Sequence, residues 1–286
     1  MIIFRLSGGF GNQLWSFAAG YQLAKETGEK YAIDTSTQEA PWFFRNYDIG
    51  HYDIKFDKKI CYKLGDGKLD HLFWNHFHRR LSLGLFTPTV KERDKEVCDL
   101  SVFDVQKKGK TIYYVGDWQH MGYIEKYQDD IRKMFVYKEK LSDVAQNYKN
   151  EISGLGQKSV AVHVRRGDYV RIGIAQNEDY YRNAVCRMAE TVGDDAVFYC
   201  FSEDIEWVRN AFKELPYKFV YMDYESEMKD LEDFEIMRIC AHQIISRSTY
   251  SWWAAWLNEN TDKVVIYPHT ENHEDPQTWS DKWICL

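Results

Sequence analysis

The segment His163–Tyr169 (HVRRGDY) carries the residue types best suited to bind an anion. It continues an apolar run, Ser159–Val164, that we expect to be a buried strand of a parallel sheet. In such sheets, ligands bind beyond the carboxyl ends of the strands. Arg165 and Arg166 can each hold phosphate oxygens bidentately, and Asp168 can orient one of them. The segment therefore predicts a phosphate site, while a salt bridge at a domain interface, from Arg166 to an acidic helix, is the structural alternative.

Two more polar segments follow predicted strands in the same half of the chain. A carboxylate of Ser202–Asp204 (SED) can accept the N–H donors of guanine or cap the helix expected over 203–215, which Ser202 can also cap. Ser246–Trp253 (SRSTYSWW) offers hydroxyl and backbone N–H groups to a diphosphate, or a helix cap before buried tryptophans. Together the three segments predict a nucleotide site. The residues expected to bind it are Arg166, Ser202, Glu203, Asp204, Arg247, Ser248, Thr249 and Ser251.

A glycine-rich turn, Gly8–Gln13 (GGFGNQ), joins the first predicted strand to a helix. Gly9 and Gly11 allow an anion to approach the helix N-terminus, and Asp34 ends the next strand, where a dinucleotide fold places its ribose-binding acid. The third glycine of that motif is replaced by Leu14, so a plain tight turn explains the segment equally well. An NAD- or FAD-linked oxidoreductase is therefore an alternative.

The order of predicted elements indicates an α/β protein with parallel sheets, in two Rossmann-type domains that face a cleft. We place the boundary before Gly154, giving domains 1–153 and 154–286, with the acceptor on the first and the nucleotide on the second. The irregular stretch 41–110 contains an amphipathic helix over 71–86. Strands are expected over 1–6, 30–34, 111–116, 159–164, 196–201, 217–222, 243–246 and 263–267, and helices over 12–27, 123–135, 138–153, 179–191, 203–215, 231–242 and 252–258.

Composition narrows the class of protein. A net charge of −7 argues against a protein that coats nucleic acid. Six scattered cysteines, a chain that begins with a strand and the lack of a long apolar run indicate a cytoplasmic protein, with peripheral attachment to the membrane left open. The sequence contains no D-x-D triplet and no residues at metal-ligand spacing. We therefore expect no metal and no cofactor besides the nucleotide substrate itself. The aromatic content of 16% leaves a non-catalytic glycan-binding protein as another alternative.

The chain resembles the bacterial α-1,2-fucosyltransferases, the galactoside 2-L-fucosyltransferases of glycosyltransferase family 11. This resemblance implies a GT-B-type fold, GDP-L-fucose as donor, a β-galactoside as acceptor, inversion at the anomeric carbon and no metal. It covers nearly the whole chain and rests on five segments in order: GGFGNQ (8–13), GDWQ (116–119), HVRRGDY (163–169), SEDIEW (202–207) and STYSWWAAWLN (248–258).

The same resemblance implies roles for four residues. Arg165 is expected to hold the β-phosphate, with His163 and Asp168 shaping the pocket. Similarity to the protein O-fucosyltransferases extends to the glycine-rich turn and implies that Asn12 lies near the reacting centre. Asp168 and His163 are also the candidates for the catalytic base.

The chain departs from the family pattern at two places. Arg247 stands where relatives usually have asparagine, which adds a third cation or removes one diphosphate contact. Asp117 and His120 stand in a GDWQH segment where many relatives have G-Y-W/F-Q-S. We expect this second departure to affect the acceptor side. The acceptor glycan and the oligomeric state do not follow from the sequence.

Overall fold

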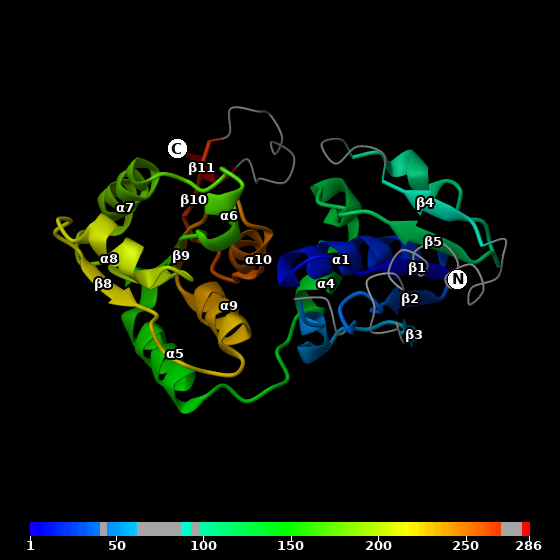
Figure 1. The fold of residues 1–286 in the computed structure, drawn as a ribbon, viewed down its shortest axis with the longest axis horizontal. Helices are drawn as coiled ribbons and strands as arrows, with labels where there is room; N and C mark the ends of the chain where they lie inside the picture. The colour runs from blue at the N-terminus through cyan, green and yellow to red at the C-terminus, as the bar shows by residue number, and fades with distance from the viewer. Residues whose placement is uncertain (41–44, 62–86, 93–97, 270–281) are drawn as a thin grey trace. The chain divides into compact units, whose positions relative to one another are not determined.

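A computed structural model describes residues 1–40, 45–61, 87–92, 98–269 and 282–286. The chain divides into two compact units, the first comprising Met1–Lys138 and the second beginning at Glu139 (Figure 1). The predicted amphipathic helix over 71–86 lies outside the described residues. Each unit is an α/β layer structure around its own parallel sheet, which confirms the predicted α/β class with parallel sheets. The facing of the two units across a cleft stays a prediction.

The boundary between the units lies before helix α5 (Asp143–Leu155) and not after it. Glu232 accepts hydrogen bonds from the backbone N–H and hydroxyl of Ser142, at 2.6 and 3.0 Å. At the other end of α5, Glu151 accepts a 2.8 Å hydrogen bond from the hydroxyl of Tyr199. These contacts anchor α5 to the second unit. The predicted boundary at 153/154 is therefore wrong by about one helix.

The first unit contains a parallel sheet of five strands in the order β3-β2-β1-β5-β4. Three of them fall on predicted strands, whereas the short strands β3 and β4 were not predicted within the irregular stretch. The strands are β1 (Ile2–Arg5), β2 (Tyr31–Asp34), β3 (Lys58–Ile60), β4 (Thr89–Lys91) and β5 (Ile112–Val115).

Two α-helices in the first unit are described, α1 (Phe10–Thr27) and α4 (Gln128–Met134). Helix α1 begins two residues earlier than predicted because Gly8, with φ of 63°, reverses the chain sharply after β1. The helix predicted over 123–135 is α-helical only in its second half. Short 3₁₀ turns span Asp48–His51, Leu100–Phe103, Met121–Tyr123 and Glu125–Tyr127.

The second unit contains a parallel sheet of six strands in the order β11-β10-β9-β6-β7-β8. From β6 the chain builds outward to β7 and β8, and then returns to the other side of β6 to form β9. The strand order therefore reverses between β6 and β9. The strands are β6 (Ser159–His163), β7 (Val197–Phe201), β8 (Lys218–Tyr221), β9 (His242–Ile244), β10 (Val265–Tyr267) and β11 (Ile284–Cys285).

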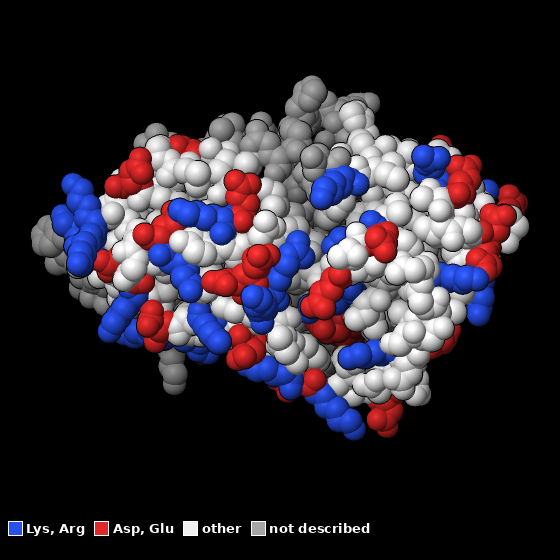
Figure 2. All heavy atoms as spheres, turned by 180° about the vertical axis from the view of Figure 1, so that it is seen from behind, with Lys and Arg blue, Asp and Glu red and all other residues white. Residues whose placement is uncertain are grey.

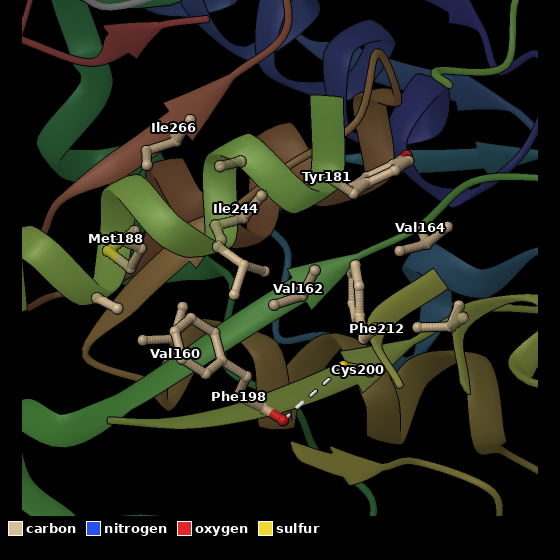
Figure 3. Close-up of a cluster of buried hydrophobic side chains, with 14 of the residues drawn as sticks. Val160, Val162, Val164, Tyr181, Met188, Phe198, Cys200, Phe212, Ile244 and Ile266 are labelled. Carbon is tan, nitrogen blue, oxygen red and sulfur yellow. Dashed lines mark hydrogen bonds between the residues drawn. The ribbon is translucent and has the colours of Figure 1, made fainter. Parts of the chain in front are cut away.

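Alternation along the strands divides the core of the second unit between the two faces of its sheet. Val160, Val162 and Phe198 pack against helices α7 (Glu178–Val192) and α8 (Ile205–Phe212), as Figure 3 shows around Tyr181, Met188 and Phe212. The opposite face is covered by α5, α9 (Lys229–Ile239) and α10 (Thr249–Leu257), with Ala255 of α10 against Ile245 and Val265. The 3₁₀ turn Gly156–Lys158 and short helix α6 (Gly167–Arg171) flank β6.

Positive and negative side chains are mixed on the surface (Figure 2), as the moderate net charge of −7 leads us to expect. On the face drawn in Figure 2, lysine and arginine side chains are interspersed with aspartate and glutamate, and the described residues form no continuous basic surface there. None of the helices in the described part of the chain has both the length and the apolar character needed to cross a bilayer. The six cysteines are free thiols.

Candidate functional site

The three polar segments of the second unit lie at the carboxyl ends of neighbouring strands. Residues 164–168 follow β6, residues 202–204 follow β7, and residues 246–251 come after β9. Strand β6 lies between the other two, and the strand order reverses between β6 and β9. A reversal of this kind opens a crevice at the carboxyl ends, where open α/β sheets bind nucleotides.

His163 ends β6 and joins it to the segment after β9. Its Nδ1 lies 3.0 Å from the hydroxyl oxygen of Ser246, and its ring lies 5.4 Å from that of Tyr250. Burial, and secondarily the positive charge of Arg165, lower the pKa of His163 to about 3. The imidazole is therefore neutral at physiological pH and a weak base, which suits a structural role better than proton transfer.

Arg165 is held between two carboxylates. Its Nη2 lies 2.6 Å from Asp168 Oδ1, and its Nη1 lies 3.4 Å from Glu203 Oε1. The guanidinium is also 5.3 Å from the ring centre of Tyr169. About a quarter of the side chain (24%) remains exposed, so the guanidinium can reach a ligand. As predicted from sequence, Asp168 is placed to orient Arg165.

Arg166 is engaged with helix α8. Its Nε lies 3.4 Å from Asp204 Oδ2, and its guanidinium carbon lies 4.1 Å from the ring centre of Trp207. The alternative of a salt bridge from Arg166 to an acidic helix is thus met in part, since the pair lies within the second unit and not at a domain interface. A guanidinium stacked on an aromatic face keeps its other N–H groups available, so ligand binding by Arg166 stays a prediction.

Glu203 occupies a position suited to an anion. Its Oε1 accepts a 3.0 Å hydrogen bond from the backbone N–H of Arg166 and also faces Arg165. A Cβ atom at Gly167 would lie only 2.7 Å from that oxygen, so the glycine gives the carboxylate room to approach. Backbone N–H and guanidinium groups are the donors that phosphate oxygens use.

The helix after β7 is capped by a carboxylate, as one of the alternatives for this segment predicted, and not by Ser202. Asp204 Oδ1 accepts the 3.2 Å hydrogen bond from the backbone N–H of Trp207, and α8 begins at Ile205. Ser202 instead accepts a 3.0 Å hydrogen bond from the N–H of Asp204. Ser202 therefore fixes the turn before the cap, and the prediction that it caps α8 is wrong.

The turn after β9 begins helix α10, and its hydroxyl groups are unequally accessible. Ser248 caps the helix by accepting from the N–H of Tyr250 at 3.3 Å. Ser251 is fully buried and donates to the carbonyl of Ser248, so it supports the turn from within. Thr249 is half-buried and lies nearer the surface. Arg247 is half-buried, and its carbonyl accepts a 3.2 Å hydrogen bond from the hydroxyl of Tyr169.

In the first unit, the glycine-rich turn lies at the carboxyl end of β1. Gly9 precedes the first residue of α1, and Gly11 is buried in the first helical turn. Asn12 folds back over Gly8, since a Cβ there would lie 2.5 Å from Asn12 Nδ2. Gln13 is buried and donates a 2.8 Å hydrogen bond to the carbonyl of Asn46, which ties α1 to the following loop.

The carboxylate of Asp34 is hydrogen-bonded within the first unit. Its Oδ1 accepts from the backbone N–H and the hydroxyl of Ser36, at 2.9 and 2.5 Å, and its Oδ2 accepts from the hydroxyl of Tyr113 at 2.6 Å. The carboxylate is buried. A dinucleotide-binding acid must present its oxygens to a ribose, and these oxygens are already bonded within the fold. The geometry therefore disfavours the oxidoreductase alternative.

The family follows from a match that covers more than two thirds of the chain. Residues 87–286 match the model for glycosyl transferase family 11, a span that contains every polar segment of the second unit. The chain belongs to glycosyl transferase family 11. The family suggested by the five segments is thereby confirmed, and a non-catalytic glycan-binding module is disfavoured.

Two relatives from Escherichia coli match this family 11 chain over nearly all of its length. The O-antigen biosynthesis glycosyltransferase WbnK is 29% identical, with 98% of this chain and 99% of WbnK covered. An α-1,2-colitosyltransferase is 26% identical over 94% of this chain and 91% of that protein. Both relatives carry glycosyltransferase names, in agreement with the enzyme class.

A solved structure shares the fold of this family 11 chain. The NodZ α-1,6-fucosyltransferase of Bradyrhizobium, in a crystal soaked with GDP-fucose, superimposes with a TM-score of 0.52. Sequence identity is 17%, with 90% of this chain and 91% of NodZ covered. The chain therefore has a fucosyltransferase-like fold.

Sequence reasoning missed some residues that build the site. Trp207 stacks on Arg166. Its position three residues after the helix-capping Asp204 could have indicated that it lies near the arginines. Tyr169 was quoted within its motif but given no role, although it joins the turns after β6 and β9. Among the described residues, no group of three or more His, Cys, Asp or Glu side chains is arranged to hold a metal ion.

Proposed function

We propose that this family 11 chain transfers L-fucose from GDP-β-L-fucose to the 2-hydroxyl of a terminal β-galactoside, with inversion at the anomeric carbon and without a metal ion. The observation that carries the proposal is the convergence of three polar segments at the strand-order reversal of the second unit. The α-1,2 linkage is supported by the relative that is named an α-1,2-colitosyltransferase, and the GDP-fucose donor by the NodZ crystal soaked with GDP-fucose.

In the proposed reaction the 2-hydroxyl oxygen of galactose forms a bond to C1 of fucose as the bond from C1 to the diphosphate oxygen breaks. Negative charge develops on the diphosphate, and Arg165 together with the turn at Ser248 and Thr249 stabilises it. Stabilisation of developing charge by fixed donors is usually the largest catalytic contribution. Arg166 and Asp204 hold the loop on which Arg165 is presented.

The proton released by the acceptor hydroxyl needs a base outside the His163–Asp168 segment. His163 has a pKa lowered to about 3, and Asp168 is paired with Arg165 at 2.6 Å. His163 is therefore a poor proton acceptor near neutral pH, and the carboxylate of Asp168 is already bonded to a guanidinium. The proposal assigns both residues to positioning Arg165 and the strand-end loop.

The decisive variant is Arg165→Ala. We expect it to lower transfer at least about a hundredfold, as removal of a donor to developing charge does. GDP should raise the melting temperature of the wild-type protein and not that of Arg165→Ala, because only a protein that binds GDP is stabilised by it. Fucose transfer to lactose, with the product linkage determined by NMR, measures the reaction directly.

The matched control is Arg187→Ala, which removes an exposed arginine paired with Glu190 on α7. It should retain wild-type transfer and GDP stabilisation. Stabilisation by NAD in place of GDP, or near-normal turnover in Arg165→Ala, would overturn the proposal. Addition of EDTA should leave the rate unchanged, and strong inhibition would contradict metal-free transfer.

A second candidate differs only in the sugar. Because one relative is named an α-1,2-colitosyltransferase, the donor could carry colitose in place of fucose. A donor panel separates the two: faster transfer of colitose than of fucose from matched GDP donors would select the second candidate.

A further inference from the structure

The turn after β5, Gly116–His120, is held in an unusual conformation at the carboxyl end of the first sheet. Trp118 is the non-glycine residue with a positive φ, 56°, among those the structure describes. Bulky side chains rarely adopt this backbone region, and residues held there cluster at functional sites. Its indole is fully buried among Phe4, Phe103 and Tyr123.

Trp118 carries a second unfavourable feature. Its indole N–H is buried and has no hydrogen-bond partner within the described part of the chain. Buried tryptophans normally find an acceptor for this group. Core packing alone would favour an apolar aromatic side chain on relaxed backbone, so the conformation of this turn calls for another explanation.

Glu92, which follows β4, fixes the turn. Its Oε2 accepts hydrogen bonds from the backbone N–H groups of Asp117 and Trp118, at 2.7 and 3.0 Å. A Cβ at Gly116 would lie 2.6 Å from the Cβ of Glu92, so a glycine is required for this approach. One carboxylate therefore sets the path of the backbone through the strained residue.

The turn lies where the strand order of the first sheet reverses. Strand β1 leads through α1 to β2 on one side, while β5 pairs on the other side of β1. The glycine-rich turn with Asn12 follows β1, and the turn held by Glu92 follows the adjacent β5. Asp117 and Gln119 flank the buried Trp118 and are themselves half-buried. A carboxylate and an amide two residues apart in a turn at such an edge suit the hydroxyl groups of a sugar.

We propose that Glu92 is a positioning residue which holds the strained turn at Trp118 so that Asp117 and Gln119 bind hydroxyl groups of the acceptor sugar. Asp117 is then the specificity-determining residue of this turn, since its carboxylate accepts hydrogen bonds from hydroxyl groups. The inference rests on the proposed fucosyl transfer, to which it adds a site for the acceptor on the first unit.

The test separates acceptor binding from donor binding. Asp117→Ala and Glu92→Ala should each raise the KM for lactose about tenfold, the effect of losing one or two well-placed hydrogen bonds. The Kd for GDP should stay within about twofold of wild type, because the nucleotide is expected on the second unit. Glu92→Gln keeps an oxygen that can accept from both N–H groups, and it should restore most of the lost affinity for lactose.

The matched control is Glu29→Ala. Glu29 also accepts a backbone hydrogen bond, from Gly109 at 2.5 Å, and it pairs with the chain amino group beside the first residue of β1. Its loss should lower the melting temperature and leave the KM for lactose unchanged. If Glu29→Ala raises that KM as Glu92→Ala does, general loosening of the unit explains the effect and the inference fails.

Asp117→Ala keeps the test decisive if Glu92→Ala does not fold, since Asp117 is half-buried and its backbone N–H is retained. An unchanged KM for lactose in Asp117→Ala overturns the inference. Saturation-transfer NMR of lactose binding needs no donor. Loss of the lactose signal in Asp117→Ala would support the inference even if the wild-type protein transferred no fucose. Absence of fucose transfer by the wild-type protein would refute the proposed function and leave the acceptor site standing.

Discussion

At the scale of single residues, the two arginines after β6 are outnumbered by carboxylates before any ligand binds. Arg165 and Arg166 face three carboxylates, those of Asp168, Glu203 and Asp204. A diphosphate brings further negative charge, so its binding requires an arginine to exchange a carboxylate partner for a phosphate. On Arg165, Glu203 is the partner more readily exchanged, because its ion pair of 3.4 Å is longer than the 2.6 Å pair with Asp168.

This arrangement predicts that Glu203→Gln binds GDP more tightly. The variant removes a negative charge next to Arg165 while keeping an oxygen that can accept from the N–H of Arg166. A partly exposed ion pair contributes about 0.5–1 kcal/mol, so the Kd for GDP should fall about two- to fivefold. Calorimetric titration of both proteins with GDP measures the change.

Weaker binding of GDP by Glu203→Gln would instead indicate that Glu203 binds the guanine base. If its carboxylate accepts the N–H donors of the base, Glu203→Gln should weaken GDP binding and leave pyrophosphate binding unchanged. Glu206→Gln provides the control, because Glu206 pairs with Arg209 on the same helix. It should leave both affinities unchanged.

At the scale of elements, the site depends on a tether between two strands that are adjacent in the sheet and distant in the sequence. His163 at the end of β6 and Ser246 after β9 are 83 residues apart in the chain and 3.0 Å apart in space. Tyr169 adds a hydrogen bond from α6 to the carbonyl of Arg247. These contacts hold the arginine loop in register with the turn that begins α10.

Ser246→Ala should therefore destabilise the second unit. The substitution leaves a buried imidazole nitrogen without its hydroxyl partner, which costs about 1–3 kcal/mol of the free energy of unfolding. Ser153→Ala serves as the control, because this exposed hydroxyl bonds only a carbonyl of its own helix and its loss should cost under about 0.5 kcal/mol. Urea unfolding measures both values, and equal costs would show that the tether is energetically unimportant.

At the scale of the whole molecule, stability should depend on pH through buried ionisable groups. The pKa of His163 is lowered from 6.5 to about 3, mainly by burial. Below pH 6.5 the unfolded chain takes up a proton that the folded chain does not, so this group destabilises the fold as pH falls. Burial, opposed by Lys229, raises the pKa of Asp233 from 3.8 to about 6. As pH falls through 6 the folded chain takes up a proton that the unfolded chain does not, so this group stabilises the fold.

His163→Gln isolates the first effect, because Asp233 is present in both proteins. Between pH 7 and pH 5, the free energy of unfolding of the wild-type protein should fall by about 2 kcal/mol relative to that of His163→Gln. Urea unfolding without nucleotide, at several pH values, gives the difference. Parallel pH dependences in the two proteins would show that His163 is protonated in the fold near its ordinary pKa.

Much of this molecule followed from the sequence by itself. Apolar runs and helical periodicity predicted the strands from β6 to β10 and the helix α7 within one or two residues of their observed ends. The polar residues after those strands predicted where a ligand would bind, and five ordered segments predicted the family. These features are local, since each depends on residues close together in the chain.

Only the tertiary structure decided the rest, because it depends on pairings between distant residues. The order β9-β6-β7, which brings the three polar segments together, is not encoded in any one of them. The pairing of Glu203 with Arg165 joins residues of different strand-end loops, and the capping of α8 by Asp204 depends on where that helix begins. Glu92 carried no signal in the sequence, because its role depends on the strained backbone of Trp118 beside it.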